Sequence, residues 1–104
     1  MPDYPLVTDY TLETLREIVP IRGGQTIHAK IVCPAYGWQW YLLSLSADGM
    51  ADCLVAGFEV ERSLVDINSL IAMRSKNILM TTFLDRGFSP RPLAGFMPPL
   101  KPVP

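Results

Sequence analysis

Hydrophobic and polar residues alternate along the middle of the chain in the manner of β-strands. Residues 27–33 alternate well enough for one strand, and residues 38–46 form a second, aromatic-rich run. Residues 34–37 supply a four-residue loop between them, and Asp48-Gly49 is a strong two-residue hairpin signal. Residues 52–60 return as a third strand. The pattern therefore predicts an antiparallel meander.

Two other segments show helical spacing of their apolar residues. Residues 8–20 are predicted as a short helix that either Thr8 or Thr11 caps. Residues 67–73 are predicted as a second helix, with Asp66 as its N-cap. We expect both helices to pack on the same face of the sheet.

The last third of the chain changes character twice. Residues 78–84 are rich in threonine and apolar side chains, which favours a fourth strand. From about residue 89 onward prolines recur, so this stretch is predicted as a polyproline-like tail. Residues 1–104 are thus expected to form a single α+β domain. Its antiparallel β-sheet has about four strands, with two short helices on one face and a proline-rich C-terminal tail.

The turns also predict which residues face each other across the strands. A two-residue turn at 48–49 puts Trp40 opposite Gly57, where an aromatic ring fills the space that a strand glycine leaves. The loop at 34–37 puts Ile31 opposite Trp40.

This register gives the sheet two unlike faces. One face is apolar, and the two helices are expected to cover it; it carries Ile27, Ala29, Ile31, Cys33, Trp38, Trp40, Leu42, Cys53 and Val55. The other is mixed; it carries His28, Lys30, Gln39, Tyr41, Leu43, Leu54, Ala56 and Phe58. A mixed, half-exposed face is typical of one that meets a partner or the tail.

Composition points toward an interaction protein. Hydrophobic residues make up 49% of the chain and charged residues only 18%, against roughly 25% in an average soluble domain. A net charge of -1 argues against a dedicated binder of duplex DNA. No apolar run reaches the roughly 18 residues that span a membrane, and the first residues lack signal-peptide character. We therefore expect a cytoplasmic protein that has no membrane partner.

Residues that carry catalytic chemistry are few. The single histidine, His28, has no Ser, Cys or Asp at catalytic spacing. The two cysteines are too few for a zinc site, and strand geometry puts them roughly 20 Å apart, too far for a disulfide. For the carboxylates Glu59, Glu61 and Asp85, a solvated strand end is favoured over a metal site. No catalytic residue, metal or other cofactor is predicted.

Between Ala29 and Leu93 the chain carries a series of blocks in a fixed order. They are Ala29-Lys30, Pro34, Trp38-Gln39-Trp40-Tyr41, Gly57-Phe58-Glu59-Val60-Glu61, Val65-Asp66-Ile67-Asn68-Ser69-Leu70, Arg74, Asp85 and Phe88-Ser89-Pro90-Arg91-Pro92-Leu93. In these blocks the chain resembles the domain of unknown function 2958 family, small proteins common on conjugative plasmids and integrative elements. It departs at residues 63–65, where the family has Gly-Tyr-Phe, and its acidic run before the last strand is reduced to Asp85.

The family has no established activity, so the resemblance implies a setting. Mobile-element proteins of this size often act on host defences or on conjugation machinery by binding a larger protein. We therefore expect a non-enzymatic protein-binding module, such as an anti-CRISPR that inhibits a host defence complex. Its partner would be a larger host or element-encoded complex, and homodimerisation stays open. The expected partner-binding residues lie on the mixed face; they are His28, Lys30, Gln39, Tyr41 and Phe58.

Two other functions stay open. A single-stranded nucleic-acid accessory protein would use Lys30, Tyr41 and Phe58, since bases stack on aromatic rings beside cations. A carboxylate-metal enzyme would be built on the three carboxylates named above. The proline tail would either bind an aromatic groove of another protein or lie across its own domain.

Overall fold

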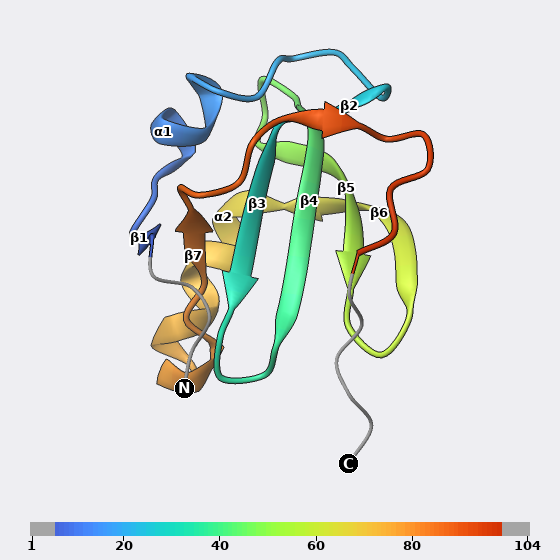
Figure 1. Cartoon of the computed structure of the whole chain (residues 1–104). Coiled ribbons are helices and arrows are strands. Elements are labelled where there is room, and N and C mark those ends of the chain that lie inside the picture. Colours follow the sequence, from blue (N-terminus) through green and yellow to red (C-terminus); the bar gives the residue numbers. More distant parts are fainter. Residues whose placement is uncertain (1–5, 99–104) are drawn as a thin grey trace.

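The computed structural model describes residues 6–98 as an antiparallel sheet with helices behind it and the C-terminal segment crossing in front (Figure 1). The six strands of this sheet run in the order β1-β7-β3-β4-β5-β6. They are β1 (Val7–Thr8), β3 (Ala29–Cys33), β4 (Trp38–Leu45), β5 (Met50–Ala56), β6 (Val60–Asp66) and β7 (Phe83–Asp85). A second, two-stranded sheet pairs β2 (Thr26–Ile27) with β8 (Arg91–Pro92).

The helices are short. They are the α-helices α1 (Leu12–Arg16) and α2 (Ile67–Ala72) and the 3₁₀-helices η1 (Met73–Ser75) and η2 (Ile78–Met80). The predicted class, α+β with an antiparallel sheet and two short α-helices, is confirmed, but the main sheet has six strands rather than about four. None of the helices within residues 6–98 is long and apolar enough to cross a membrane.

The hairpin of β3 and β4 has the predicted register. Ile31 lies opposite Trp40, and Cys33 lies opposite Trp38 at the end of the hairpin. The loop between them closes when the backbone N–H of Gly37 donates to the carbonyl of Cys33 at 2.8 Å. Gly37 has a φ of 73°, a left-handed conformation that glycine adopts without strain.

The predicted register of the β4–β5 hairpin is wrong. Its loop has three residues, because the N–H of Ser46 donates to the carbonyl of Met50 at 2.9 Å and Gly49 takes a φ of 89°. This loop shifts the pairing by one residue. A bulge between Leu42 and Ser44 then shifts it by one more.

The corrected register changes the partner of Gly57. Trp40 lies opposite Val55, not Gly57. The ring of Trp38 lies over Gly57 instead, and a Cβ added there would stand 2.5 Å from two of its carbon atoms. An aromatic ring does cover this glycine, as the pattern predicts, but it belongs to the other tryptophan.

Local signals fix the helix starts better than the helix ends. Thr11 caps α1, accepting from the N–H of Thr14 at 3.1 Å, but α1 is shorter than the predicted 8–20. Asp66 caps α2 as predicted, accepting from the N–H of Asn68 at 3.0 Å. The residues before Asp66 form strand β6, which was not predicted.

The predicted fourth strand, 78–84, is wrong over its first part and correct at its end. Its first part is the 3₁₀-helix η2, because the side chain of Asn77 accepts from the N–H of Leu79 at 3.0 Å and starts a helical turn. Only Phe83–Asp85 pair as a strand, between β1 and β3.

The helix side of the sheet holds the larger core. Both α-helices contribute to it, through Leu15 of α1 and through Ile67 and Leu70 of α2. The sheet contributes most of the residues predicted for the apolar face; those buried in this core are Ala29, Ile31, Leu42 and Cys53. Alternation therefore identifies this face correctly from residue 29 onward.

The front of the sheet holds a second, smaller core beneath the C-terminal strap, defined as residues 88–98 (Figure 1). Its buried members are Ile27, Tyr41, Leu43 and Ala56, with Phe88, Leu93 and Phe96 of the strap packed against them. The N–H of Leu93 donates to the carbonyl of Gln25 at 2.9 Å, next to the β2–β8 pairing.

Two predictions are settled by this second core. Ile27 belongs to this second core and not to the core on the helix side. The predicted strand is interrupted at His28, so Ile27 lies in β2 and not in β3. The described part of the predicted tail lies across its own domain, while residues 99–104 of that tail lie outside the described residues.

Candidate functional site

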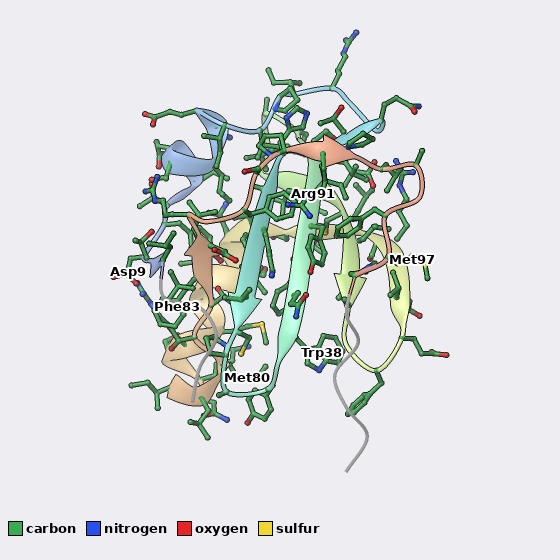
Figure 2. All side chains as sticks on the ribbon, viewed as in Figure 1. Asp9, Trp38, Met80, Phe83, Arg91 and Met97 are labelled. Atoms are coloured by element: carbon green, nitrogen blue, oxygen red, sulfur yellow. The ribbon has the colours of Figure 1, made fainter. Side chains whose placement is uncertain are left out.

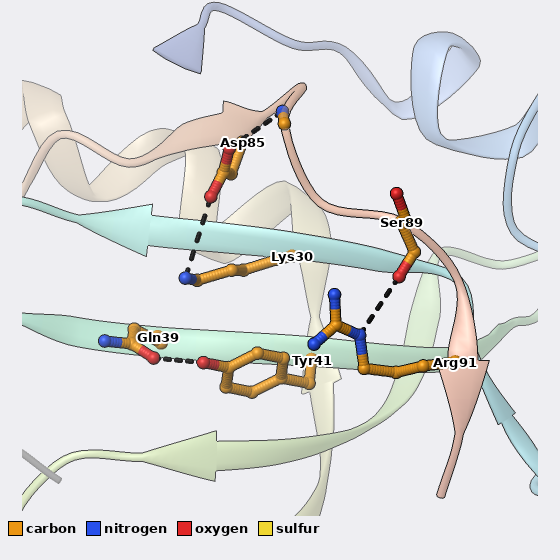
Figure 3. Close-up of polar contacts among 7 residues, drawn as sticks. Lys30, Gln39, Tyr41, Asp85, Ser89 and Arg91 are labelled. Atoms are coloured by element: carbon orange, nitrogen blue, oxygen red, sulfur yellow. Dashed lines mark hydrogen bonds and ion pairs between the residues drawn. The ribbon is translucent and has the colours of Figure 1, made fainter. Parts of the chain in front are cut away.

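Tyr41 and Gln39, two of the predicted partner contacts, lie beneath the strap. Tyr41 is only 1% exposed, and its ring lies 5.8 Å from that of Phe88 and 4.8 Å from that of Phe96, centroid to centroid. Its hydroxyl donates to Oε1 of Gln39, which is also buried (Figure 3). The strap therefore stands between these two side chains and any partner.

Lys30 is held in an ion pair on the same face. Its Nζ lies 3.6 Å from Oδ2 of Asp85 and 5.7 Å from the centre of the Tyr41 ring (Figure 3). Oδ1 of Asp85 also accepts from the N–H of Gly87 at 2.9 Å, which anchors the carboxylate. Charge on this face is thus partly balanced within the protein.

The strap supplies a second cation near this cluster. Nε of Arg91 donates to the carbonyl of Ser89 at 3.2 Å, and its guanidinium lies 4.7 Å from the centre of the Phe88 ring (Figure 3). These contacts hold Arg91 along the strap.

His28 and Phe58, the remaining predicted contacts, lie apart from that cluster. His28 is half-buried at the break between β2 and β3, where it lines a hollow with Phe88 and Pro90 of the strap. Phe58 lies in the turn between β5 and β6 and is 55% exposed. The structure brings Lys30, Gln39 and Tyr41 together but leaves Phe58 elsewhere. Partner binding by these residues stays a prediction.

The three candidate carboxylates do not converge. Asp85 lies on β7 and Glu61 on β6, with β3, β4 and β5 between them in the sheet. Within residues 6–98 no group of three metal-binding side chains comes together.

The cysteines lie apart, as predicted, and both are buried and unbridged. Sγ of Cys53 donates to the carbonyl of Ser63 at 3.7 Å. Burial, helped by the charge of Asp52, raises the pKa of the Cys53 thiol to about 12.

A different surface emerges at one end of the sheet. Here β3 ends and β4 begins, β5 turns into β6, and η2 precedes β7, so several loops meet. Three large apolar side chains are exposed on these connections: Phe58 at 55%, Ile78 at 80% and Leu79 at 56%. We call this surface, with Trp38, the hydrophobic end.

Trp38 connects the parts of the hydrophobic end. The ring of Phe58 stands edge-on to Trp38, with 6.3 Å between the centroids, and the ring of Trp40 also lies 6.3 Å from that of Trp38. Figure 2 shows Trp38 and Met80 at this same end, next to the loop that joins β3 and β4. Trp38 and Trp40 form one wall of a recess.

That recess is a hollow of about 300 Å³ between the end of the sheet and the helices that follow it. Aromatic and sulfur-containing side chains dominate its lining, which consists of Cys33, Tyr36, Trp38, Trp40, Leu70, Met73, Met80 and Thr82. None of these side chains belongs to Asp, Glu, Lys, Arg or His.

Polar groups in the hollow already have partners. The hydroxyl of Thr82 hydrogen-bonds to that of Tyr10 at 2.6 Å, and burial raises the pKa of Tyr10 to about 12. Sγ of Cys33 donates to the carbonyl of Leu79 at 3.4 Å. The hollow is therefore a mainly apolar recess.

The pattern of hydrophobic residues in the sequence does not predict this surface. Residues 78–80 are an apolar run that resembles a buried strand, and only the capping residue Asn77 indicates a helical turn instead. A turn on the surface exposes side chains that a strand in the sheet would bury.

No family model, curated protein or solved structure matches this chain. The resemblance to the domain of unknown function 2958 family therefore stays a prediction. Its blocks do coincide with definite features of the fold. Residues 38–41 begin β4, residues 57–61 turn into β6, and residues 88–93 begin the strap.

Proposed function

We propose that this chain is a non-enzymatic protein-binding module that contacts its partner through the hydrophobic end. The observation that carries the proposal is that exposed Phe58, Ile78 and Leu79 lie at the same end of the sheet as an apolar hollow walled by two tryptophans. Phe58 stands against Trp38 of that wall, and Ile78 and Leu79 line a neighbouring hollow. Exposed apolar side chains that lie close together mark interaction sites, and aromatic side chains dominate the energetics of interfaces.

The available free energy is adequate for binding. Fully burying a large apolar side chain is worth about 1.5–3 kcal/mol relative to leaving it in water. Phe58, Ile78 and Leu79 are each more than half exposed, so a partner that covers all three gains several kcal/mol. Trp38 contributes further area beside Phe58.

The proposed setting comes from the family resemblance. In that setting the partner is a larger host or element-encoded complex in the cytoplasm, and the most specific form of the proposal is an inhibitor of a host defence system. Binding by an exposed apolar surface suits such a role, because an inhibitor needs no chemistry beyond occupying a surface of its target.

The alternatives draw less support from the geometry. Base stacking on Tyr41 would require the strap to leave, since its ring is covered by Phe88 and Phe96. A carboxylate-metal site would require Asp85 and Glu61 to meet across three intervening strands.

A pair of matched variants tests the proposal. Ile78→Ser with Leu79→Ser removes two exposed apolar side chains from the hydrophobic end. Leu6→Ser with Ile21→Ser removes one leucine and one isoleucine of similar exposure, 56% and 66%, from outside that end. Each protein is immobilised, after circular dichroism shows that it is folded, and used to capture partners from host lysate.

The result that supports the proposal is a difference in partner binding between the two variants. We expect one stoichiometric partner that the native protein and the Leu6/Ile21 control both retain, and that the Ile78/Leu79 variant binds at least about tenfold more weakly once the partner is purified. Equal binding by both variants, or equal loss in both, would contradict the proposal.

A further inference from the structure

The geometry points to the side chain that the hollow receives: we propose that an uncharged aromatic ring of the partner protein, phenylalanine-like, inserts into it. This inference rests on the proposed function and names the occupant of the same surface. It follows from the size of the hollow, the chemistry of its wall and the exposed apolar side chains at the same end of the sheet.

The hollow is large enough for a ring. Its volume is about 300 Å³, and an apolar protein cavity of about 150 Å³ takes up benzene. A phenylalanine ring therefore fits with room for its Cβ and for part of the backbone that carries it. A methyl-sized side chain would leave most of the hollow empty.

The wall selects an uncharged occupant. None of the lining side chains is Asp, Glu, Lys or Arg, so a charge inserted here would lose its water without gaining a partner. The thiol of Cys33 and the hydroxyl of Thr82 already have protein partners. The lining is almost entirely apolar, which favours phenylalanine over tyrosine.

The wall also favours a ring over an aliphatic side chain. Met73 and Met80 present thioethers, and sulfur contacts to aromatic rings are favourable beyond their apolar area. Trp38 and Trp40 are tilted by 40° to each other, so an inserted ring can meet at least one of them edge-on.

Exposed apolar side chains outside the hollow favour a ring that belongs to a protein. Phe58 stands edge-on to Trp38 of the wall, whereas Ile78 and Leu79 line a neighbouring hollow. A free aromatic molecule would fill the hollow and leave these exposed side chains in water. A polypeptide that inserts one ring can cover some of them with its neighbouring residues.

The methionines provide direct reporters for the test. Met73 and Met80 line the hollow, whereas Met50 at the start of β5 and Met97 on the strap do not. Protein labelled with ¹³C at the methionine methyl groups is titrated with N-acetyl-phenylalaninamide and, separately, with N-acetyl-leucinamide. We expect saturable methyl shifts at Met73 and Met80 alone. The phenylalanine probe should bind about two- to tenfold tighter than the leucine probe.

Two variants locate the binding. Cys33→Phe fills the hollow with a ring from the protein itself, and Met80→Lys puts a charge on a half-buried wall residue that tolerates substitution more readily. Both should abolish the shift at Met73. Unchanged probe binding in a folded variant of either kind would overturn the proposal, as would absence of any shift at Met73 and Met80 in the native protein.

Competition separates a partner's ring from a free ligand. Excess N-acetyl-phenylalaninamide should weaken binding of the captured partner if both use the hollow. A probe that binds without competing would mean that the hollow serves a free aromatic molecule, which overturns this inference. If the Ile78/Leu79 variant loses the partner but the probe never binds, only the occupant is wrong. If the probe binds and no partner depends on this end, the proposed function is wrong.

Discussion

Replacing Tyr41 with alanine tests whether Tyr41 is a buried core residue or an exposed partner contact. The mixed face of the sheet predicts Tyr41 as an exposed anchor, whose removal together with Phe58 would leave the fold intact. In the structure Tyr41 is 1% exposed and lies between the sheet and the strap, against Phe88 and Phe96. Tyr41→Ala should therefore destabilise the protein.

The magnitude follows from what the substitution removes. Truncating a buried large aromatic side chain to alanine costs about 3–5 kcal/mol, from lost apolar burial and the cavity left behind. Tyr41→Phe keeps the ring and removes only the hydroxyl that donates to Gln39, so it should cost about 1 kcal/mol. Phe58→Ala truncates a ring that is 55% exposed and should also cost about 1 kcal/mol.

Urea unfolding measures all three variants. With a denaturant slope of about 1.5 kcal/mol per molar urea, Tyr41→Ala should lower the midpoint by about 2–3 M. Tyr41→Phe and Phe58→Ala should each lower it by less than about 1 M. The emission of Trp38 and Trp40 reports the transition, and far-ultraviolet circular dichroism checks that unfolding is two-state.

One pattern of results would refute this reasoning. If Tyr41→Ala has the midpoint of the native protein while Phe58→Ala is strongly destabilised, the strap does not cover Tyr41 in solution. The mixed face would then be exposed, as alternation along the strands predicts.

Two further perturbations test other parts of the structure. Gly57→Ala puts a Cβ about 2.5 Å from ring atoms of Trp38, so the ring must move; we expect a shifted tryptophan emission maximum and a loss of about 1–3 kcal/mol in urea unfolding. Burial raises the pKa of Cys53 from about 9 and that of Tyr10 from about 10, each to about 12. Both groups hold their protons more tightly when folded, so stability should be full below about pH 9 and fall as the pH rises toward 12. Urea midpoints between pH 8 and 11 check this, and Cys53→Ala should flatten the fall between pH 9 and 10.

The reliability of the sequence prediction depends on how local each interaction is. The β3–β4 register and the capping of α2 by Asp66 are set by residues within a few positions, and both are predicted correctly. The β4–β5 register depends on the left-handed Gly49 and on a bulge after Leu42, which hydrophobic alternation does not reveal. Strand β6 is exposed almost throughout and so lacks the apolar pattern of a buried strand.

The candidate site illustrates the same limit. Alternation correctly places Lys30, Gln39 and Tyr41 on one face of the sheet. Whether that face meets water depends on the strap, which lies about fifty residues further along the chain and packs through Phe88 and Phe96. The hydrophobic end is formed by loops that are distant in the sequence, so no single stretch of residues predicts it.

Position-specific photo-crosslinking tests most directly whether the hydrophobic end is the contact surface. A benzophenone amino acid replaces Ile78 at the hydrophobic end, Ile21 outside it, or Arg91 on the strap; all three side chains are exposed. Each protein is irradiated with the captured partner and the adducts are mapped by mass spectrometry. We predict a discrete adduct from position 78 and none from positions 21 and 91. An adduct from position 91 with none from position 78 would contradict the account and return the interaction to the strap side of the sheet.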